Sequence, residues 1–364
     1  MRAGHVLYSG LGGHGSVFFS IAKAPARSGV QHYPIFYGIE ALRKEYQDNC
    51  AELGLDLVSI KKKSGSYLGP TLTLVRSFFK LGVDAVVVHS GASLPAAAMF
   101  RLLKPRSVLL FVEHQAPKFK SKPEWLASLV AHWVCHKVIY LTKSSQQQIK
   151  EKLGPFYRPS RAALIPNGID IERFCPRPQG PKAVFALGMA ARMNDLKDHE
   201  TLIRALAFTG TQGDRLHLFL AGDGPTRVRL ELLAEELNIA EKITFMGVLN
   251  EDALICFYQG LDLYLHCTFG EMMSTSVMQA QACGLPVIAS DVPHLAEQIS
   301  HGEDGILVPS SDPNALIRAI TSLRDNAHAR GLMSKTARKK AEAAYSHHVM
   351  RQDYDNLIIS IVDR

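Results

Sequence analysis

Two basic residues and a helix start in the second half of the chain have the chemistry to bind an anion. Arg192 and Lys197 lie in one loop, between an apolar run and a helical pattern. Arginine offers a planar fork of donors and lysine a mobile charge, a pair that suits a diphosphate. Two solvated surface charges are the alternative interpretation. Further along, Met273, Ser274 and Thr275 lead into another helical pattern, whose first N–H groups can hold an anion.

A glycine loop, GLGGHG, follows the first apolar run at residues 10–15. It matches the dinucleotide fingerprint, in which glycines let backbone N–H groups approach a phosphate at a helix N-terminus. The fingerprint also needs an acidic residue at the end of the second strand, and no carboxylate comes before Glu40. We therefore expect Gly12, Gly13 and His14 to serve a different phosphate or sugar ligand. A plain sharp turn is the other interpretation.

Three further side chains, Glu271, Gln279 and His114, can hydrogen-bond a ligand. Glu271 and Gln279 are eight residues apart, a little over two helical turns. His114 closes the apolar run SVLLFVEH, and active-site groups of open α/β sheets gather at such strand ends. A lone histidine is more often structural, so the pattern leaves both roles open for His114.

The elements that must position these residues alternate between short apolar runs and helical patterns. Continuous runs such as AVVVH fit strands buried on both faces of a parallel sheet. The strand ranges expected in the first half are 5–10, 32–37, 56–61, 84–90, 107–114, 137–142 and 162–166. Those expected in the second half are 183–188, 216–221, 242–247, 261–266, 285–290 and 305–309.

A linker with three prolines, residues 175–182, separates the two halves. We expect an α/β fold of two Rossmann-like domains whose parallel sheets face each other across an interdomain cleft. The first domain would span residues 1–178 and the second residues 179–345. A C-terminal helix over residues 346–364 would pack back on the first domain.

The charge of the chain is divided unevenly between these halves. The 364 residues carry 41 Lys+Arg and 34 Asp+Glu, a net charge of +7. Residues 1–181 hold 24 basic and 11 acidic side chains, and residues 182–364 hold 17 and 23. The cationic half favours a polyanionic partner. With no apolar run of 18 residues and no secretory leader, we expect a cytoplasmic protein.

A lysine- and tryptophan-rich segment is the candidate for contact with the partner. Lys118, Lys120 and Lys122 precede Trp125 and Trp133, which recur with leucines at helical spacing. One interpretation is a core helix with a solvated lysine approach. The other is a peripheral face that binds anionic lipid headgroups at the inner side of the membrane. Nucleic acid is not expected, because no aromatic-interleaved basic motif is present.

The ordered set of motifs resembles the retaining family 4 glycosyltransferases, which are the glycosyl transferases group 1 of GT-B fold. The family's G-R-x(4)-K loop corresponds to Arg192 and Lys197, with Ala191 replacing its glycine. Its G-x-G strand end, F-x-G element, E-x(7)-E motif and A-x-G-x-P segment follow in order. The matching positions begin at Gly222, Phe245, Glu271 and Ala282.

This resemblance implies a metal-independent hexosyltransferase that uses a nucleotide diphosphate sugar such as a UDP-sugar. It would need no cofactor and would retain the anomeric configuration. Glu271 and His114 would contact the transferred sugar. The remaining expected substrate-binding positions are Gly12, Gly13, His14, Arg192, Lys197, Val248, Met273, Ser274, Thr275 and Gln279. Gln279 stands where the family has glutamate, so we expect weaker contacts to the ribose hydroxyls.

The family's commonest role is polysaccharide or lipopolysaccharide biosynthesis on a lipid-linked acceptor. Two other functions stay open: an epimerase or synthase that makes a soluble glycoside, and an inactive glycan- or nucleotide-binding subunit. A rival architecture would hold a metal with a D-x-D motif, and only Asp353 and Asp355 have that spacing. On a helix these two carboxylates point to different faces, so we expect them to be solvated surface acids.

Overall fold

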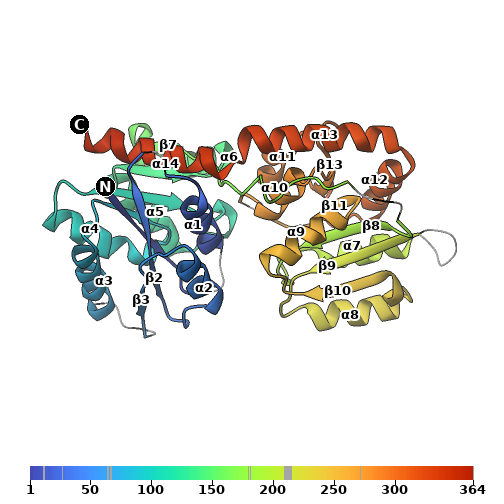
Figure 1. Ribbon diagram of the computed structural model, residues 1–364, viewed down its shortest axis with the longest axis horizontal. Helices are drawn as coiled ribbons and strands as arrows, with labels where there is room; N and C mark the ends of the chain where they lie inside the picture. Colours follow the sequence, from blue (N-terminus) through green and yellow to red (C-terminus); the bar gives the residue numbers. More distant parts are fainter. Residues whose placement is uncertain are drawn as a thin grey trace. The chain divides into compact units, whose positions relative to one another are not determined.

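The computed structural model describes residues 1–10, 13–26, 28–63, 65, 68–178, 180, 182–208, 215–270 and 272–363. The chain divides into two compact units, each built on a parallel sheet of its own (Figure 1). The first unit combines Met1–Gly168 with His347–Arg364, and the second is Ile169–Ser346. Both sheets show the strand–helix alternation that the sequence predicts, and the α/β expectation is confirmed.

The sheet of the first unit has seven strands in the order β3-β2-β1-β4-β5-β6-β7. The order reverses between β1 and β4, two strands that are adjacent in the sheet but not in the sequence. Every residue of β4 and β5 is buried, as the continuous apolar runs require. The strands are β1 (Arg2–Leu7), β2 (Gln31–Gly38), β3 (Val58–Lys61), β4 (Ala85–Val88), β5 (Val108–Glu113), β6 (Lys137–Tyr140) and β7 (Ala162–Leu164).

Helices bury both faces of this sheet. Val6 joins the core under α3 to α6, whereas its neighbour Leu7 packs with α1 and α2, because successive strand residues point to opposite faces. The helices are α1 (Gly13–Lys23), α2 (Lys44–Glu52), α3 (Leu68–Leu81), α4 (Leu94–Leu103), α5 (Lys122–Val134), α6 (Lys143–Leu153) and α14 (His347–Val362).

The C-terminal helix α14, red in Figure 1, belongs to the first unit and contacts α1. Arg351 fixes it there. Its buried guanidinium donates hydrogen bonds to the carbonyls of Ile21 and Val30, each at 3.2 Å.

The sheet of the second unit has six strands in the order β10-β9-β8-β11-β12-β13, with the reversal between β8 and β11. Its strands are β8 (Phe185–Ala190), β9 (Leu216–Ala221), β10 (Ile243–Gly247), β11 (Leu263–His266), β12 (Val287–Ser290) and β13 (Gly305–Val308). Its helices are α7 (His199–Ala207), α8 (Arg227–Glu236), α9 (Glu251–Gly260), α10 (Thr275–Ala282), α11 (Pro293–Gln298), α12 (Pro313–Asp325) and α13 (Ala327–Ala344).

The boundary between the units precedes Ile169, earlier than the expected residue 178. Ile169 forms a bridge with Ser346, and the Arg338 guanidinium donates to the carbonyls of Ile171 and Phe174. These contacts attach the segment after Gly168 to the second unit before the proline-rich stretch begins. Among the described residues, no helix has the length and apolarity needed to cross a membrane.

Candidate active site

Two histidines meet at the carboxyl edge of the first sheet. His114 directly follows β5, and His14 lies in the first turn of α1. Their ring centroids are 4.5 Å apart. The Nε2 atom of His114 lies 2.8 Å from Nδ1 of His89, which directly follows β4. The chain reversal beside β1 therefore gathers residues from three separate segments, as expected for a ligand site in an open α/β sheet.

Burial keeps these imidazoles neutral near pH 7. It lowers the pKa of His14 to about 4 and the pKa of His114 well below its ordinary value. The charges of His14 and His89 on a protonated His114 act in the same direction. Neutral rings donate one hydrogen bond and accept one, so this pair suits hydroxyl groups better than anions.

Of the glycine loop, Gly10 and the residues from Gly13 onward are described. Gly12 falls outside the described residues, and Gly13 begins α1. The Glu40 carboxylate lies so close to Gly10 that an added Cβ there would come within 1.9 Å of it. Glu40 accepts the Tyr8 hydroxyl at 2.8 Å, one residue after β1 ends at Leu7. The strand expected over 5–10 is found three residues earlier, at Arg2–Leu7.

Arg192 is exposed on a loop that glycines hold against the second sheet. Ala191 N donates to Ala221 O, and Met193 N donates to Asp223 O, each at 3.0 Å. Gly222 has a φ of +126°, and an added Cβ there would lie 2.0 Å from Ala191 O. This G-x-G strand end thus gives the Arg192 loop its close approach.

Lys197 reaches the start of α10 through a histidine. Its Nζ atom lies 3.4 Å from Nε2 of His266, and the same nitrogen lies 3.2 Å from Oγ of Ser274. His266 is buried and ends β11, on the opposite side of the chain reversal from β8. The structure therefore brings Lys197 and Ser274 to one place. The sequence pattern did not single out His266, although this residue ends β11 much as His114 follows β5.

At the N-terminus of α10, one of the backbone N–H groups expected to bind an anion is already hydrogen-bonded. Ser274 N–H already donates to Oε1 of Gln298 at 2.7 Å, so it is not available to a phosphate. Thr275 is the first helical residue, and its turn supplies the amides that lack intrahelical partners. Met273 precedes them and is buried.

Gln279 lies four residues after Thr275, about one helical turn further along, and is half-buried on α10. Its Oε1 atom accepts the Tyr258 hydroxyl at 3.1 Å. Burial, assisted by nearby Tyr264, raises the pKa of Tyr258 far above its ordinary value, so this hydroxyl stays protonated. Glu271 falls outside the described residues. Val248 follows β10 with 73% of its surface exposed, and no described contact joins it to Lys197 or Ser274.

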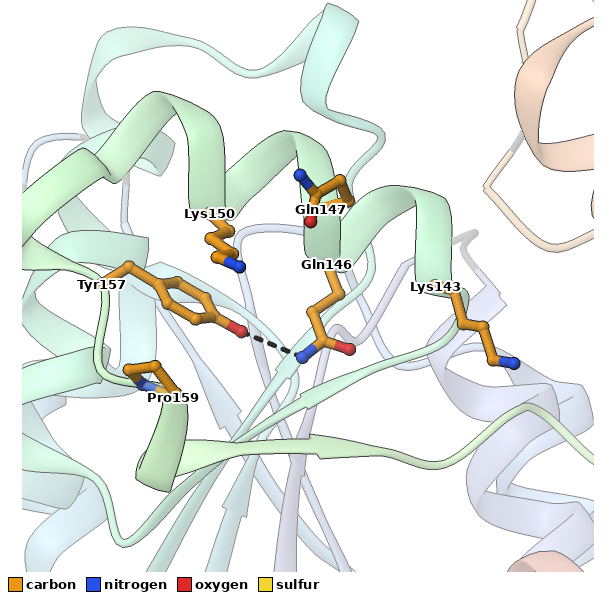
Figure 2. A pocket seen from close by; sticks show the side chains of 6 residues that line it. All are labelled: Lys143, Gln146, Gln147, Lys150, Tyr157 and Pro159. Carbon is orange, nitrogen blue, oxygen red and sulfur yellow. Dashed lines mark hydrogen bonds between the residues drawn. The ribbon is translucent and has the colours of Figure 1, made fainter.

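A surface pocket shown in Figure 2 lies elsewhere on the first unit, beside α6. Gln146 donates to the Tyr157 hydroxyl across it at 3.0 Å. None of the residues expected from the sequence lines this pocket. Its lining consists of Lys143, Gln146, Gln147, Lys150, Tyr157 and Pro159.

The lysine- and tryptophan-rich segment is partly buried and partly exposed. Lys120 is not a solvated lysine, because it is buried and pairs with Glu113 at 2.5 Å. Trp125 packs against the core. Along the outer side of α5, however, Leu126 and Trp133 are 60% and 51% exposed. The helix thus buries one side and exposes an apolar stripe on the other.

Asp355 contradicts the expectation of two solvated acids on the last helix. It is 2% exposed, and its carboxylate accepts hydrogen bonds from His32 and from Ser28. Asp353, two residues earlier, stays partly exposed. The helical geometry separates the two carboxylates as predicted, but it turns one of them into the protein interior.

Two Rossmann-like units with polar residues at both chain reversals define a GT-B protein. Residues 176–340 match the family model of glycosyl transferases group 1, and residues 11–173 match that of glycosyltransferase family 4. The chain therefore belongs to the group 1 glycosyl transferases of family 4.

Individual relatives agree with this assignment. The D-inositol 3-phosphate glycosyltransferase of Salinispora tropica is 28% identical over 50% of this chain and 43% of its own length. The exopolysaccharide phosphotransferase SCO2592 of Streptomyces coelicolor is 27% identical over 86% of this chain and 32% of its own. The chain thus spans less than half the length of these curated relatives.

Among solved structures, Anabaena HepE in complex with UDP and glucose has a TM-score of 0.84. The match covers 99% of this chain and 100% of that one, at 18% sequence identity. At this identity the likeness concerns the fold alone, and the fold is GT-B.

Proposed function

We propose that the protein transfers a sugar from a nucleotide diphosphate donor to a glycan acceptor, with retention of anomeric configuration and without a metal. The observation that carries this proposal is the convergence of Lys197, His266 and Ser274 at the chain reversal of the second sheet. Open α/β sheets bind nucleotides at such a point. HepE, of the same fold, was crystallised with UDP and glucose, which favours a UDP-sugar here.

The cations would act on the leaving group. As the glycosidic bond breaks, negative charge grows on the β-phosphate, and donors already in place stabilise it without reorganising. Arg192 and Lys197 would supply two of these donors, together with the amides of Gly13 and Thr275. Gln279 would hold the ribose hydroxyls through a neutral amide.

The sugar would be bound by neutral and acidic groups. It becomes cationic in the transition state, and the Glu271 carboxylate would hold its ring hydroxyls and soften that charge. His114 and His14 would contact the sugar and the acceptor as neutral hydrogen-bonding rings.

The acceptor is proposed to be lipid-linked, in the biosynthesis of a cell-surface polysaccharide or lipopolysaccharide. Support comes from the exposed apolar stripe of α5 in the cationic half, which would place the protein at the cytoplasmic face of the membrane. A soluble acceptor, as for an inositol phosphate glycosyltransferase, would leave that stripe without a role. An inactive nucleotide-binding subunit is the second candidate, and Gln279 is the residue that favours it.

A thermal-shift panel of nucleotide diphosphate sugars tests the donor. A cognate donor at a hundred times its Kd adds about 2.7 kcal/mol to folding stability, so its melting temperature rises measurably. Lys197→Met should lose most of this rise. Lys335→Met, an equivalent change on the exposed side of α13, should keep it. A chain stabilised by none of the donors, or equally in both variants, would contradict the proposal.

A further inference from the structure

Five side chains of the first unit form an unbroken row of hydrogen bonds through its interior. The row runs from Asp355 on α14 through His32 on β2, His5 on β1 and His89 to His114. The distances are 2.7 Å from Asp355 Oδ1 to His32 Nε2 and 2.8 Å from His32 Nδ1 to His5 Nε2. They continue as 3.0 Å from His5 Nδ1 to His89 Nε2 and 2.8 Å from His89 Nδ1 to His114 Nε2. We call these five residues the histidine row.

The row joins a buried carboxylate to the candidate active site. His5, His32, His89 and Asp355 are each at most 3% exposed, whereas His114 is half-buried at the carboxyl edge of the sheet. Aromatic rings from two helices flank its middle, since Phe18 of α1 and Tyr354 of α14 have centroids 5.2 and 6.1 Å from that of His5. Each ring nitrogen between the ends faces its neighbour rather than a common point, which is the geometry of a relay and not of a metal site.

The carboxylate fixes the direction of every bond. Asp355 accepts the Ser28 hydroxyl at 2.5 Å, and Nε of Arg351 lies 3.7 Å away. His32, Ser28 and Arg351 hold the pKa of Asp355 below its ordinary value against its burial, so it is ionised and can only accept. Burial lowers the pKa of His32, as it does for the other rings of the row.

The tautomer of each ring then follows from the one donor and one acceptor that a neutral imidazole has. A neutral imidazole has one N–H and one lone pair. His32 must donate from Nε2 to Asp355, so its Nδ1 accepts from Nε2–H of His5. By the same rule, Nδ1 of His5 accepts from Nε2–H of His89, and Nδ1 of His89 accepts from Nε2–H of His114. All four rings are therefore Nε2–H tautomers, and His114 keeps a lone pair on Nδ1 at the active-site end.

We propose that the histidine row is a proton relay that makes Nδ1 of His114 a base. When that atom takes a proton, the Nε2 proton of each ring moves to Nδ1 of the next, and His32 passes its proton to Asp355. The row ends as four Nδ1–H rings and a neutral carboxyl, with a net gain of one proton. The reverse shift returns it.

In the sugar transfer proposed above, the acceptor hydroxyl would supply this proton; that use rests on the proposed function. The hydroxyl oxygen forms the bond to the anomeric carbon while the bond to the β-phosphate breaks and its electron pair leaves with the nucleoside diphosphate. His14 faces the same end of the row. Its buried Nδ1 has no partner among the described residues, which leaves it for the same substrate.

Nitrogen-15 NMR of histidine-labelled protein tests the row directly, because the two neutral tautomers have distinct ring-nitrogen shifts. In the unaltered chain near pH 7.5, His5, His32, His89 and His114 should all be Nε2–H, with signals assigned from single-histidine variants. Asp355→Asn should reverse the row, since an amide can donate to His32, and convert His114 to the Nδ1–H form. Asp353→Asn, the same change on the same helix, should leave the tautomers unaltered. A cationic or Nδ1–H ring in the unaltered protein would overturn the relay.

The turnover of Asp355 variants tests the use of the row in sugar transfer. Proton transfer by a positioned side chain contributes about 10²–10⁴-fold, so Asp355→Asn should lower kcat at least 10²-fold with KM little changed. Asp355→Glu should restore part of the loss, which a purely structural defect would not predict. If the tautomers change but kcat does not, the relay has no part in transfer. If the unaltered chain turns over no nucleotide sugar, the proposed function fails while the NMR result on the row still stands.

Discussion

At the residue scale, Gln279 is where the chain departs from the motif of its family. An amide in place of a carboxylate gives up a charge-assisted hydrogen bond to the ribose, a difference of about 1 kcal/mol. The Tyr258 hydroxyl that donates to Gln279 Oε1 would donate equally to a carboxylate, so the local geometry accepts the family residue.

We therefore predict that Gln279→Glu tightens donor binding about fivefold, measured by calorimetric titration of the donor selected by thermal shift. Gln352→Glu, on the exposed side of α14, makes the same charge change away from the site and should leave the Kd unaltered. Equal affinity of Gln279→Glu and the parent chain would remove the ribose role from this position.

The residues of the histidine row mark how far sequence could predict the site. His114 was predictable, because it closes an apolar run at a strand end. His5, His32 and Asp355 were not, since they lie on β1, β2 and α14, and only the return of the last helix to the first sheet brings them into contact. Lys197 and Ser274 were predictable, because the first lies in a basic loop and the second leads into a helical pattern. The strand order that places His266 between them was not predictable.

At the scale of elements, the strand–helix alternation was the strongest signal. Each expected strand is present, because continuous apolar runs such as those of β4 and β5 are fully buried only in a sheet covered on both faces. The ends of elements depend on tertiary contacts instead. The strand expected over 5–10, for example, is found over Arg2–Leu7, and the next residue, Tyr8, donates its hydroxyl to Glu40.

Helix α5 carries the prediction at this scale. Its exposed side chains should bind vesicles that contain anionic lipid, and binding should weaken as salt rises. Leu126→Gln combined with Trp133→Gln should reduce co-sedimentation strongly. Leu232→Gln, which removes a 59% exposed leucine from α8 of the second unit, should not. Absence of salt-sensitive binding by the parent chain would end the membrane interpretation.

At the scale of the whole molecule, we expect the two units to differ in their response to acid. The first unit holds the histidine row, and burial also lowers the pKa of His14 and His132 to about 4, as it does for His199 in the second unit. Such histidines are protonated more readily in the unfolded chain. Their contribution to stability is therefore complete above pH 6.5 and is lost as pH falls from 6.5 toward 4. One group of this kind costs about 2 kcal/mol at pH 5.

We predict that the first unit unfolds at lower urea concentration at pH 5 than at pH 7.5, while the second unit changes less. Both tryptophans of the chain, Trp125 and Trp133, lie in α5, so their fluorescence reports the first unit alone. Circular dichroism follows both units. An unchanged fluorescence midpoint at pH 5 would mean that these histidines are not buried as neutral rings.

The release of nucleoside diphosphate from the stabilising donor, with and without lipid extract, tests the central claim most directly. The parent chain should release it in proportion to added acceptor, with the sugar transferred in retained configuration. His114→Ala should still be stabilised by the donor but should turn it over about 10²-fold or more slowly. Near-normal turnover by His114→Ala would end its role at the site. No turnover of any nucleotide sugar by the parent chain, with or without lipid, would contradict the account as a whole.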